Sequence, residues 1–440
     1  MNSLKTFFKA KTTDELLLAA LVFFLPFERI PSIDIFGVSL RLSFIVAGVI
    51  IVRALLVLVK TRFNLVRQDL PVKMLLVFVF WILVTVLIAI NVPRALQVVI
   101  FTSFTIMTAI AVRVLYKPEH LKTIINALLW SALLVATFGV YQYFGNMAGL
   151  PDWATGMRSM YSWQIFGFPR IHSTALEPLY YCSYLLIPIS YLLTQLLRKK
   201  TMGWKYPSLF VLLVASLIMT LSRGGVAAFI GMLIVATGML IARKQVTVKS
   251  FGRVVGLVVA SIGVSMLIIN LVSREPLNKT ITGGEKGSAG YTSQLKKTSL
   301  DGSGDDRGMM RSQAISLYTD NGRRIIVGIG PGQFGPYIQD NKADSVGGWK
   351  VVNNETLELL LEYGLIGALI LGIFLLIILS KAWQVSKSTF DLQASVSVAL
   401  IAYIFALLIQ YQTFSTLYIM HVWVVIGLLM ALGANSQKKA

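Results

Sequence analysis

Residues 347–372 read GGWKVVNNETLELLLEYGLIGALILG, and this stretch changes from a polar approach into a long apolar helix without leaving the helical period. Asn353 and Asn354 are favourable N-cap residues for that helix. Glu355 and Glu358 follow in its first turn, where carboxylates suit the positive end of a helix dipole. The stretch therefore predicts a helix that begins near residue 355 and continues into a membrane.

The same helix carries an unusual row of acids. Glu355, Glu358 and Glu362 fall at positions i, i+3 and i+7, so one face holds three carboxylates at the start of a predicted transmembrane segment. Ionisable residues at membrane depth normally face a bundle interior or a wet cavity, and they indicate a functional site. Ordinary first-turn acids standing above the lipid would also explain Glu355 and Glu358, but they explain Glu362 less well.

Composition indicates the broad class. The chain has 440 residues, of which 56% are hydrophobic and 14% are charged, and many apolar runs approach the roughly 20 residues that cross a bilayer. We therefore predict an all-α polytopic membrane protein with about twelve transmembrane helices. The predicted spans are residues 16–26, 38–59, 72–90, 95–115, 121–144, 175–197, 206–221, 225–242, 254–272, 355–379, 395–412 and 417–432.

These spans divide the chain into three parts. Residues 1–272 hold the first nine predicted helices, including a short aromatic extracytoplasmic loop at 145–173. Residues 273–352 form one large extracytoplasmic loop, and residues 353–440 hold the last three helices. The density of Trp, Tyr and Phe in the short loop is typical of a membrane-interface belt or a sugar-stacking surface, and the belt is favoured.

The formal net charge of +20 raises the possibility of a nucleic-acid partner. Lys and Arg, however, lie in the short connections between apolar runs and form no aromatic-interleaved patch, as the positive-inside rule requires. The charges predict that both termini are cytoplasmic, and they argue against nucleic-acid binding. Cys182 is the single cysteine, so no intramolecular disulfide is possible.

Several arginines lie in connections on the predicted outer side of the membrane. They are informative because the positive-inside rule predicts that outer connections are poor in arginine. Arg170 lies at the mouth of one span in GFPRIHSTALEP, and Arg223 lies between two spans in TLSRGG. Arg307 and Arg311 are four residues apart on a predicted loop helix at 307–318, so both can point the same way. Guanidinium groups grip phosphate oxygens in a bidentate manner, which predicts a diphosphate site. Arg170 and Arg223 could alternatively be interface anchors that reach the headgroups.

Three further polar features accompany these arginines. Glu177 follows Arg170 one turn inside the next predicted span, beside Pro178, and could act as a general base or only pair with Arg170 or Arg223. His172 could carry a proton or be structural. The run at 328–332, GIGPG, could present amides to an anion, although a simple turn is favoured. We find no P-loop, HExxH, CxxC or nucleophile elbow, and we predict no metal and no cofactor.

Taken in order, RIHSTALEP, TLSRGG, DDRGMMRSQA, GIGPGQF and NNETLELLLEYGLIG resemble the superfamily of O-antigen ligases and Wzy-type O-antigen polymerases. The resemblance extends from about Arg170 to Gly372. It implies a GT-C-like glycosyltransferase that uses undecaprenyl-diphosphate-linked glycans, with its active site on the extracytoplasmic face of the bacterial plasma (inner) membrane. The implied partners are a glycan donor, a glycan acceptor and the bilayer, and also assembly proteins such as a flippase and a chain-length regulator.

The resemblance also implies roles for individual residues. Arg223 takes the place of the Ser-Arg arginine of the family, and Arg307 takes that of its loop arginine. Asn353 and Asn354 stand where the ligases carry His-Asn, and Asn cannot act as a titrating base. The implied reaction is a metal-independent, inverting transfer in which the catalytic residues are Arg223, Arg307 and either Glu177 or Glu355. Arg170, His172, Arg311, Asn353 and Asn354 would bind the substrates.

Three classes of function remain open. A polymerase of lipid-linked repeat units is favoured because the ligase-associated His is missing. A ligase that transfers a finished glycan to a lipid or protein acceptor is the alternative. A transporter of lipid-linked sugars is the third class, but it should show repeated halves with broken helices at the bilayer midplane, whereas the charged residues here gather at one face.

Overall fold

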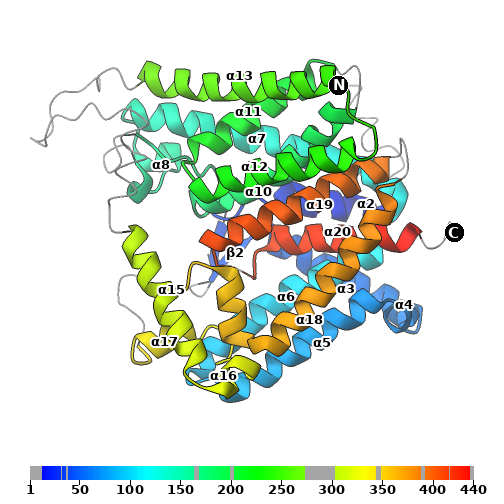
Figure 1. The fold of residues 1–440 in the computed structure, drawn as a ribbon, viewed down its shortest axis with the longest axis vertical. Coiled ribbons are helices and arrows are strands. Elements are labelled where there is room, and N and C mark those ends of the chain that lie inside the picture. The colour runs from blue at the N-terminus through cyan, green and yellow to red at the C-terminus, as the bar shows by residue number, and fades with distance from the viewer. Residues whose placement is uncertain are drawn as a thin grey trace, which may run out of the picture.

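The computed structural model describes residues 12–30, 32–35, 38–162, 168–198, 203–272, 303–342, 348–387, 392–415 and 417–436. Within these residues, nine helices are long and apolar enough to cross a membrane. The chain is therefore an all-α polytopic membrane protein with one small hairpin (Figure 1).

The N-terminal half contains most of the bundle. Its elements are α2 (Thr13–Phe24), β1 (Ser32–Ile35), β2 (Val38–Arg41), α3 (Leu42–Lys60), α4 (Asn64–Gln68), α5 (Leu70–Thr85), η1 (Val86–Ile88), α6 (Val92–Leu115), η2 (Pro118–His120), α7 (Leu121–Met147), α8 (Asp152–Thr155), η3 (Ser159–Tyr161) and α10 (Pro178–Arg198).

The C-terminal half completes the bundle and adds the large loop. Its elements are α11 (Lys205–Met219), α12 (Arg223–Ile241), α13 (Val248–Val272), α15 (Ser303–Thr319), α16 (Gly322–Val327), α17 (Phe334–Ile338), α18 (Glu355–Val385), α19 (Leu392–Gln410), η4 (Tyr411–Thr413) and α20 (Met420–Ser436).

Each predicted span overlaps one of these helices, but three of them are short. Helices α2, α11 and α20 have 12, 15 and 17 residues, fewer than the roughly 20 that a straight helix needs to cross a bilayer. Helix α5 has 16 residues, but η1 continues the same apolar span to Ile88. The predicted span 38–59 also begins too early, because residues 38–41 pair as β2 with β1 in an antiparallel hairpin and the helix starts at Leu42. An apolar run alone does not distinguish a strand from the first turn of a helix.

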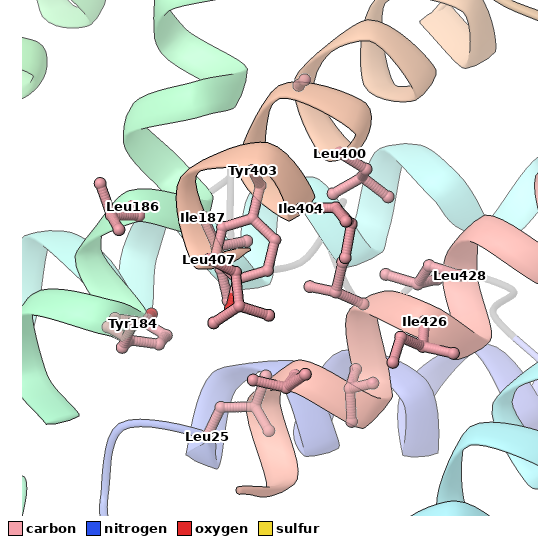
Figure 2. Packing of buried hydrophobic residues seen from close by; sticks show 14 of the residues in the cluster. Leu25, Tyr184, Leu186, Ile187, Leu400, Tyr403, Ile404, Leu407, Ile426 and Leu428 are labelled. Carbon is pink, nitrogen blue, oxygen red and sulfur yellow. The ribbon is translucent and has the colours of Figure 1, made fainter. Parts of the chain in front are cut away.

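Helix α10 lies at the centre of the bundle. Its most apolar window is 89% buried although its mean hydropathy is only 1.2, whereas the window of α13 is 22% buried with a mean hydropathy of 2.1. The less apolar helix is thus the one surrounded by protein, and α13 is left to face lipid. Figure 2 shows Tyr184, Leu186 and Ile187 of α10 in the same cluster as side chains of α19 and α20.

The described part of the large loop packs against α18. Helices α15 and α16 both contact α18, and α15, α16 and α17 lie together beside it in Figure 1. A small separate core joins them, formed by Met310, Ala314, Ile329, Phe334, Val352 and Leu361. The prediction of a helix at 307–318 is confirmed by α15. The predicted turn-rich segment 278–304 lies almost entirely outside the described residues.

Aromatic residues of the loop at 145–173 have different environments. Trp153 is 86% exposed, as an interface residue would be, whereas Phe168 is buried. Trp163 and Phe166 lie outside the described residues. The loop is therefore only partly the exposed belt that its composition predicts.

Candidate active site

Arg170 lies against the turn that joins α11 to α12. Its backbone N–H donates to the carbonyl of Tyr161 at 2.9 Å, and its Nε donates to the carbonyl of Thr220 at 3.3 Å. Its guanidinium carbon lies 5.8 Å from the centroid of the Tyr161 ring. These contacts hold the Arg170 guanidinium beside the residues that open α12.

Arg223 is the first residue of α12, and its position follows from the local sequence. Ser222 is the N-cap, and its Oγ accepts a hydrogen bond from the Gly225 N–H at 3.1 Å. A Cβ on Gly225 would lie 2.0 Å from the Sγ of Cys182, and one on Gly224 would lie 2.2 Å from the Oγ1 of Thr413. The glycine pair thus lets α12 approach α10 and η4 closely, with Arg223 at its tip.

Arg307 and Arg311 extend from α15 toward the same place. Protein packed around Arg307 lowers its pKa, and the positive charges of Arg223 and Arg311 lower it further. Burial likewise lowers the pKa of Arg170, and the charges of Arg307 and Arg223 add to this effect. Arg170, Arg223 and Arg307, from three distant parts of the chain, therefore lie within electrostatic reach of one another, and Arg311 lies within reach of Arg307.

Among the described residues, Glu177 is an acid that acts on this cationic cluster. Its negative charge opposes the lowering of the pKa of both Arg170 and Arg307. The helix begins at Pro178, so Glu177 lies just before α10, and the prediction that it lies one turn inside the span is wrong. Proline suits the first helical position because its missing N–H has no helical partner there.

His172 supports the loop from inside and has no exposed surface. Its Nδ1 lies 3.0 Å from the carbonyl of Ala175, and its Nε2 accepts a hydrogen bond from the Arg158 N–H at 3.2 Å. Burial lowers the pKa of His172 to about 4, so the ring is neutral at physiological pH. With both ring nitrogens occupied, His172 is not placed to contact a substrate, which corrects the predicted binding role.

The start of α18 connects to the cationic cluster through η4. Asn354 is the N-cap, and its Oδ1 accepts from the Leu357 N–H at 3.0 Å. Its Nδ2 donates to the Oε1 of Gln412 at 3.3 Å. The Nη2 of Arg311 donates to the backbone carbonyl of the same Gln412.

Glu355 and Asn353 flank this N-cap. Glu355 is buried, and its N–H donates to the carbonyl of Phe414 at 3.0 Å. Asn353 adopts a left-handed backbone with φ of 57°, which Asn tolerates better than most residues. The helix start is therefore fixed against the connection between α19 and α20.

The glycine-rich run at 328–332 is a packed turn whose amides are used inside the protein. The N–H groups of Ile329 and Gly330 donate to the carbonyls of Leu361 and Glu362, each at 2.9 Å. Those carbonyls are available because α18 is interrupted at Gly364, where φ is 65° and ψ is −175°. These two amides are thus not open to an anion, and the structure shows the turn that the sequence favoured.

Glu362 is buried against the same glycine-rich turn, and the backbone amides of Gly332 and Phe334 face its carboxylate. The row of three acids is therefore divided, with Glu362 supporting the turn and Glu355 lying near η4.

Two residues that the sequence did not single out complete the site. Gln412 joins α15 to α18, and Tyr161 lies beneath the guanidinium groups of Arg158 and Arg170, 5.7 and 5.8 Å from its centroid. A polar QYQT run between two spans was the available signal for Gln412. Within the described residues, no group of three His, Cys, Asp or Glu side chains could hold a metal ion.

Comparison with known families matches residues 208–372 to the family model described as O-antigen ligase. The matched region runs from α11 to the middle of α18, and it includes Arg223, Arg307, Arg311, Asn354 and Glu355. No curated protein matches the chain.

Proposed function

Because residues 208–372 match a family model described as O-antigen ligase, which implies glycosyl transfer, we propose that this chain polymerises undecaprenyl-diphosphate-linked oligosaccharide repeat units into a surface polysaccharide. The reaction would take place at the outer face of the bacterial plasma membrane. One observation supports the proposal most strongly: Arg170, Arg223 and Arg307 gather beside Glu177 at one end of the bundle.

The arginines would bind the lipid-borne diphosphate of the donor. As the bond between the anomeric carbon and the diphosphate oxygen breaks, its electron pair moves to that oxygen and negative charge develops there. Guanidinium groups already fixed around this position stabilise the charge without reorganisation during the reaction. Arg170 is held by Tyr161 and Thr220, so its preorganisation has a structural basis. The arginines supply the positive charge that a metal ion would otherwise provide.

An acceptor sugar hydroxyl would attack the anomeric carbon from the face opposite the diphosphate. The new glycosidic bond forms with inverted configuration, and the hydroxyl proton passes to a base. Glu177 is the first candidate base because it lies beside Arg170 and Arg307. Glu355 is the second, since it follows Asn354, whose amide would position a sugar.

A ligase reaction is the second candidate function, and it is supported by the description of the matched family. Both reactions use the same donor chemistry and differ in the acceptor. The polymerase is favoured because Asn353 and Asn354 stand where the resemblance implies a ligase His-Asn pair. Lipid-linked sugar transport is the third candidate.

The test is a reaction of the purified chain in lipid nanodiscs with a short polyprenyl-diphosphate oligosaccharide, without nucleotide or added metal, followed by sizing of the products. A ladder of products supports the polymerase. A single transfer to an added lipid or protein acceptor supports the ligase instead. Absence of transfer to every acceptor, together with movement of the lipid-linked sugar across a liposome membrane, would support transport and refute the proposed enzyme.

A further inference from the structure

A cavity of about 470 Å³, largely apolar but lined by three charged side chains, lies beside the cationic cluster and does not include it. It is formed by the segment after α2, the first turns of α3, α6 and α10, and the segment before α20. The lining residues that matter here are Glu28, Arg41, Phe44, Arg94, Tyr180 and Tyr418. Its volume is within the range of roughly 300–1,000 Å³ that small-molecule sites occupy, which is room for sugar units but not for a polymer.

Glu28 is the buried acid of this cavity. Only 6% of its surface is exposed, and its Oε2 accepts a hydrogen bond from the Leu176 N–H at 3.3 Å. Burial raises the pKa of the Glu28 carboxyl, and the positive charge of Arg41 partly opposes this. Such a carboxyl can exchange hydrogen bonds with hydroxyl groups, either as an acceptor or, when protonated, as a donor.

Two arginines face the same space. The Arg41 guanidinium lies 5.2 Å from the centroid of the Phe44 ring. The Nη1 of Arg94 donates to the Oε1 of Gln97 at 3.1 Å, and the buried Arg94 Nε has no hydrogen-bond partner within the described residues. Both guanidinium groups line the cavity and can donate hydrogen bonds to sugar hydroxyls.

These lining groups suit a carbohydrate better than a second diphosphate. A sugar ring presents an apolar C–H face and a rim of hydroxyls, which match the rings of Phe44 and Tyr180 and the polar groups of Arg41 and Glu28. A diphosphate would leave the aromatic walls and the buried Glu28 carboxyl without a partner, whereas a sugar can contact both.

The cavity also lies next to the candidate base, Glu177. Leu176, which donates to Glu28, directly precedes Glu177. The charge of Glu177 contributes to raising the pKa of Glu28, and it acts on Arg170 and Arg307 as well. Glu177 is therefore within electrostatic reach of both the cavity and the cationic cluster.

We propose that this cavity is the acceptor subsite, which binds the terminal sugar of the acceptor glycan and presents its hydroxyl to Glu177. The inference rests on the proposed function. It assigns the donor diphosphate to the arginines of the cluster and the acceptor sugar to a separate pocket. The anomeric carbon of the donor would lie between the cluster and the pocket.

The test measures two ligands separately on the full chain in nanodiscs. The acceptor probe is a lipid-free oligosaccharide made by partial acid hydrolysis of the surface polysaccharide of the host strain, and the donor probe is farnesyl diphosphate. We expect Arg41→Gln to weaken oligosaccharide binding about tenfold to a hundredfold, as loss of a charged hydrogen bond does. We expect farnesyl diphosphate binding to change less than about twofold.

A second variant keeps the test informative if Arg41→Gln fails to fold. Gln97→Trp fills the cavity from an exposed position on α6, and it should weaken oligosaccharide binding at least as much as Arg41→Gln. Arg323→Gln, an exposed arginine on α16, is the matched control and should leave both affinities unchanged. Thermal unfolding of each variant in nanodiscs confirms that the fold is intact.

The outcomes separate this inference from the proposed function. Oligosaccharide binding that is absent from the parent protein, or that Gln97→Trp leaves intact, overturns the acceptor subsite even if transfer proceeds. Binding of both probes at separable sites without any glycosyl transfer supports the sugar pocket but refutes the enzyme.

Discussion

Arg311 of α15 donates a hydrogen bond to the backbone carbonyl of Gln412, which lies 101 residues away in the connection between α19 and α20. The side chain of Gln412 in turn accepts from the Asn354 Nδ2 at 3.3 Å and donates to the Thr356 Oγ1 at 3.1 Å. One glutamine thus joins the large loop to the start of α18. The position of the loop arginines depends on this junction.

Gln412→Ala should remove the side-chain bonds to Asn354 and Thr356, together with a local one to the Leu408 carbonyl, and keep the carbonyl that Arg311 uses. Since a hydrogen bond contributes about 1 ± 0.5 kcal/mol, we expect transfer to fall about threefold to tenfold, with little loss of expression. Steady-state kinetics with the lipid-linked donor measure this. An unchanged rate would mean that the junction does not position the site.

Arg307→Lys should reduce the transfer rate by about 10²–10³-fold, because lysine keeps the charge but loses the fork that grips a diphosphate. Membrane insertion should be normal, because Arg307 lies on α15, which is not among the helices long and apolar enough to cross a membrane. Polymer length on gels and turnover of the purified chain are the measurements. Arg323→Lys is the control, and normal polymer in Arg307→Lys would remove Arg307 from the mechanism.

Glu177→Gln should lower kcat by about 10²–10⁴-fold, the range over which a general base contributes, while donor binding stays nearly unchanged. Glu355→Gln made in parallel identifies the base, because only one of the two carboxylates takes the proton. If Glu355→Gln has the larger effect on kcat, the base lies at the start of α18, and Glu177 only offsets the positive charge of the arginines.

His172 should make the stability of the protein depend on pH. Burial lowers its pKa from 6.5 to about 4, so between these values the unfolded chain binds more protons than the folded one. Stability is therefore full above about pH 6.5 and falls as the pH drops toward about 4, by up to roughly 3 kcal/mol.

His172→Gln should reduce that dependence. The melting temperature of parent and variant, measured from pH 7 to 4.5, gives the comparison, and the difference between the two chains isolates His172 from other titrating groups. A variant whose melting temperature falls as steeply with pH as that of the parent would show that His172 is not the cause.

Gly364→Ala should destabilise the junction between α18 and the glycine-rich turn. The residue has φ of 65°, and an added Cβ would lie 2.3 Å from the carbonyl oxygen of Ile326. Strain of this kind costs about 1–3 kcal/mol before the clash is counted. Gly372→Ala, on the same helix with nothing within 4 Å of the added Cβ, is the control and should be neutral or slightly stabilising.

Much of the helical framework is predictable from the sequence because its signals are local. Apolar runs show where helices lie, and Asn354 and Ser222 form N-caps that depend only on residues three positions away. Local signals did not reveal the β1–β2 hairpin, which depends on how two short segments pair. The start of α10 at Pro178 did have a local signal, because proline suits the first helical position, but the apolar run made the predicted span begin three residues earlier.

The sequence alone determined that the chain is a helical membrane protein, since hydropathy and helix capping are properties of neighbouring residues. It also identified the arginines, because short outside connections between apolar spans are normally poor in Lys and Arg. Only the tertiary structure decided which of them meet, that His172 is enclosed, and that Glu362 supports a turn. Those outcomes depend on contacts between residues far apart in the chain, and such contacts exist only after the helices have packed.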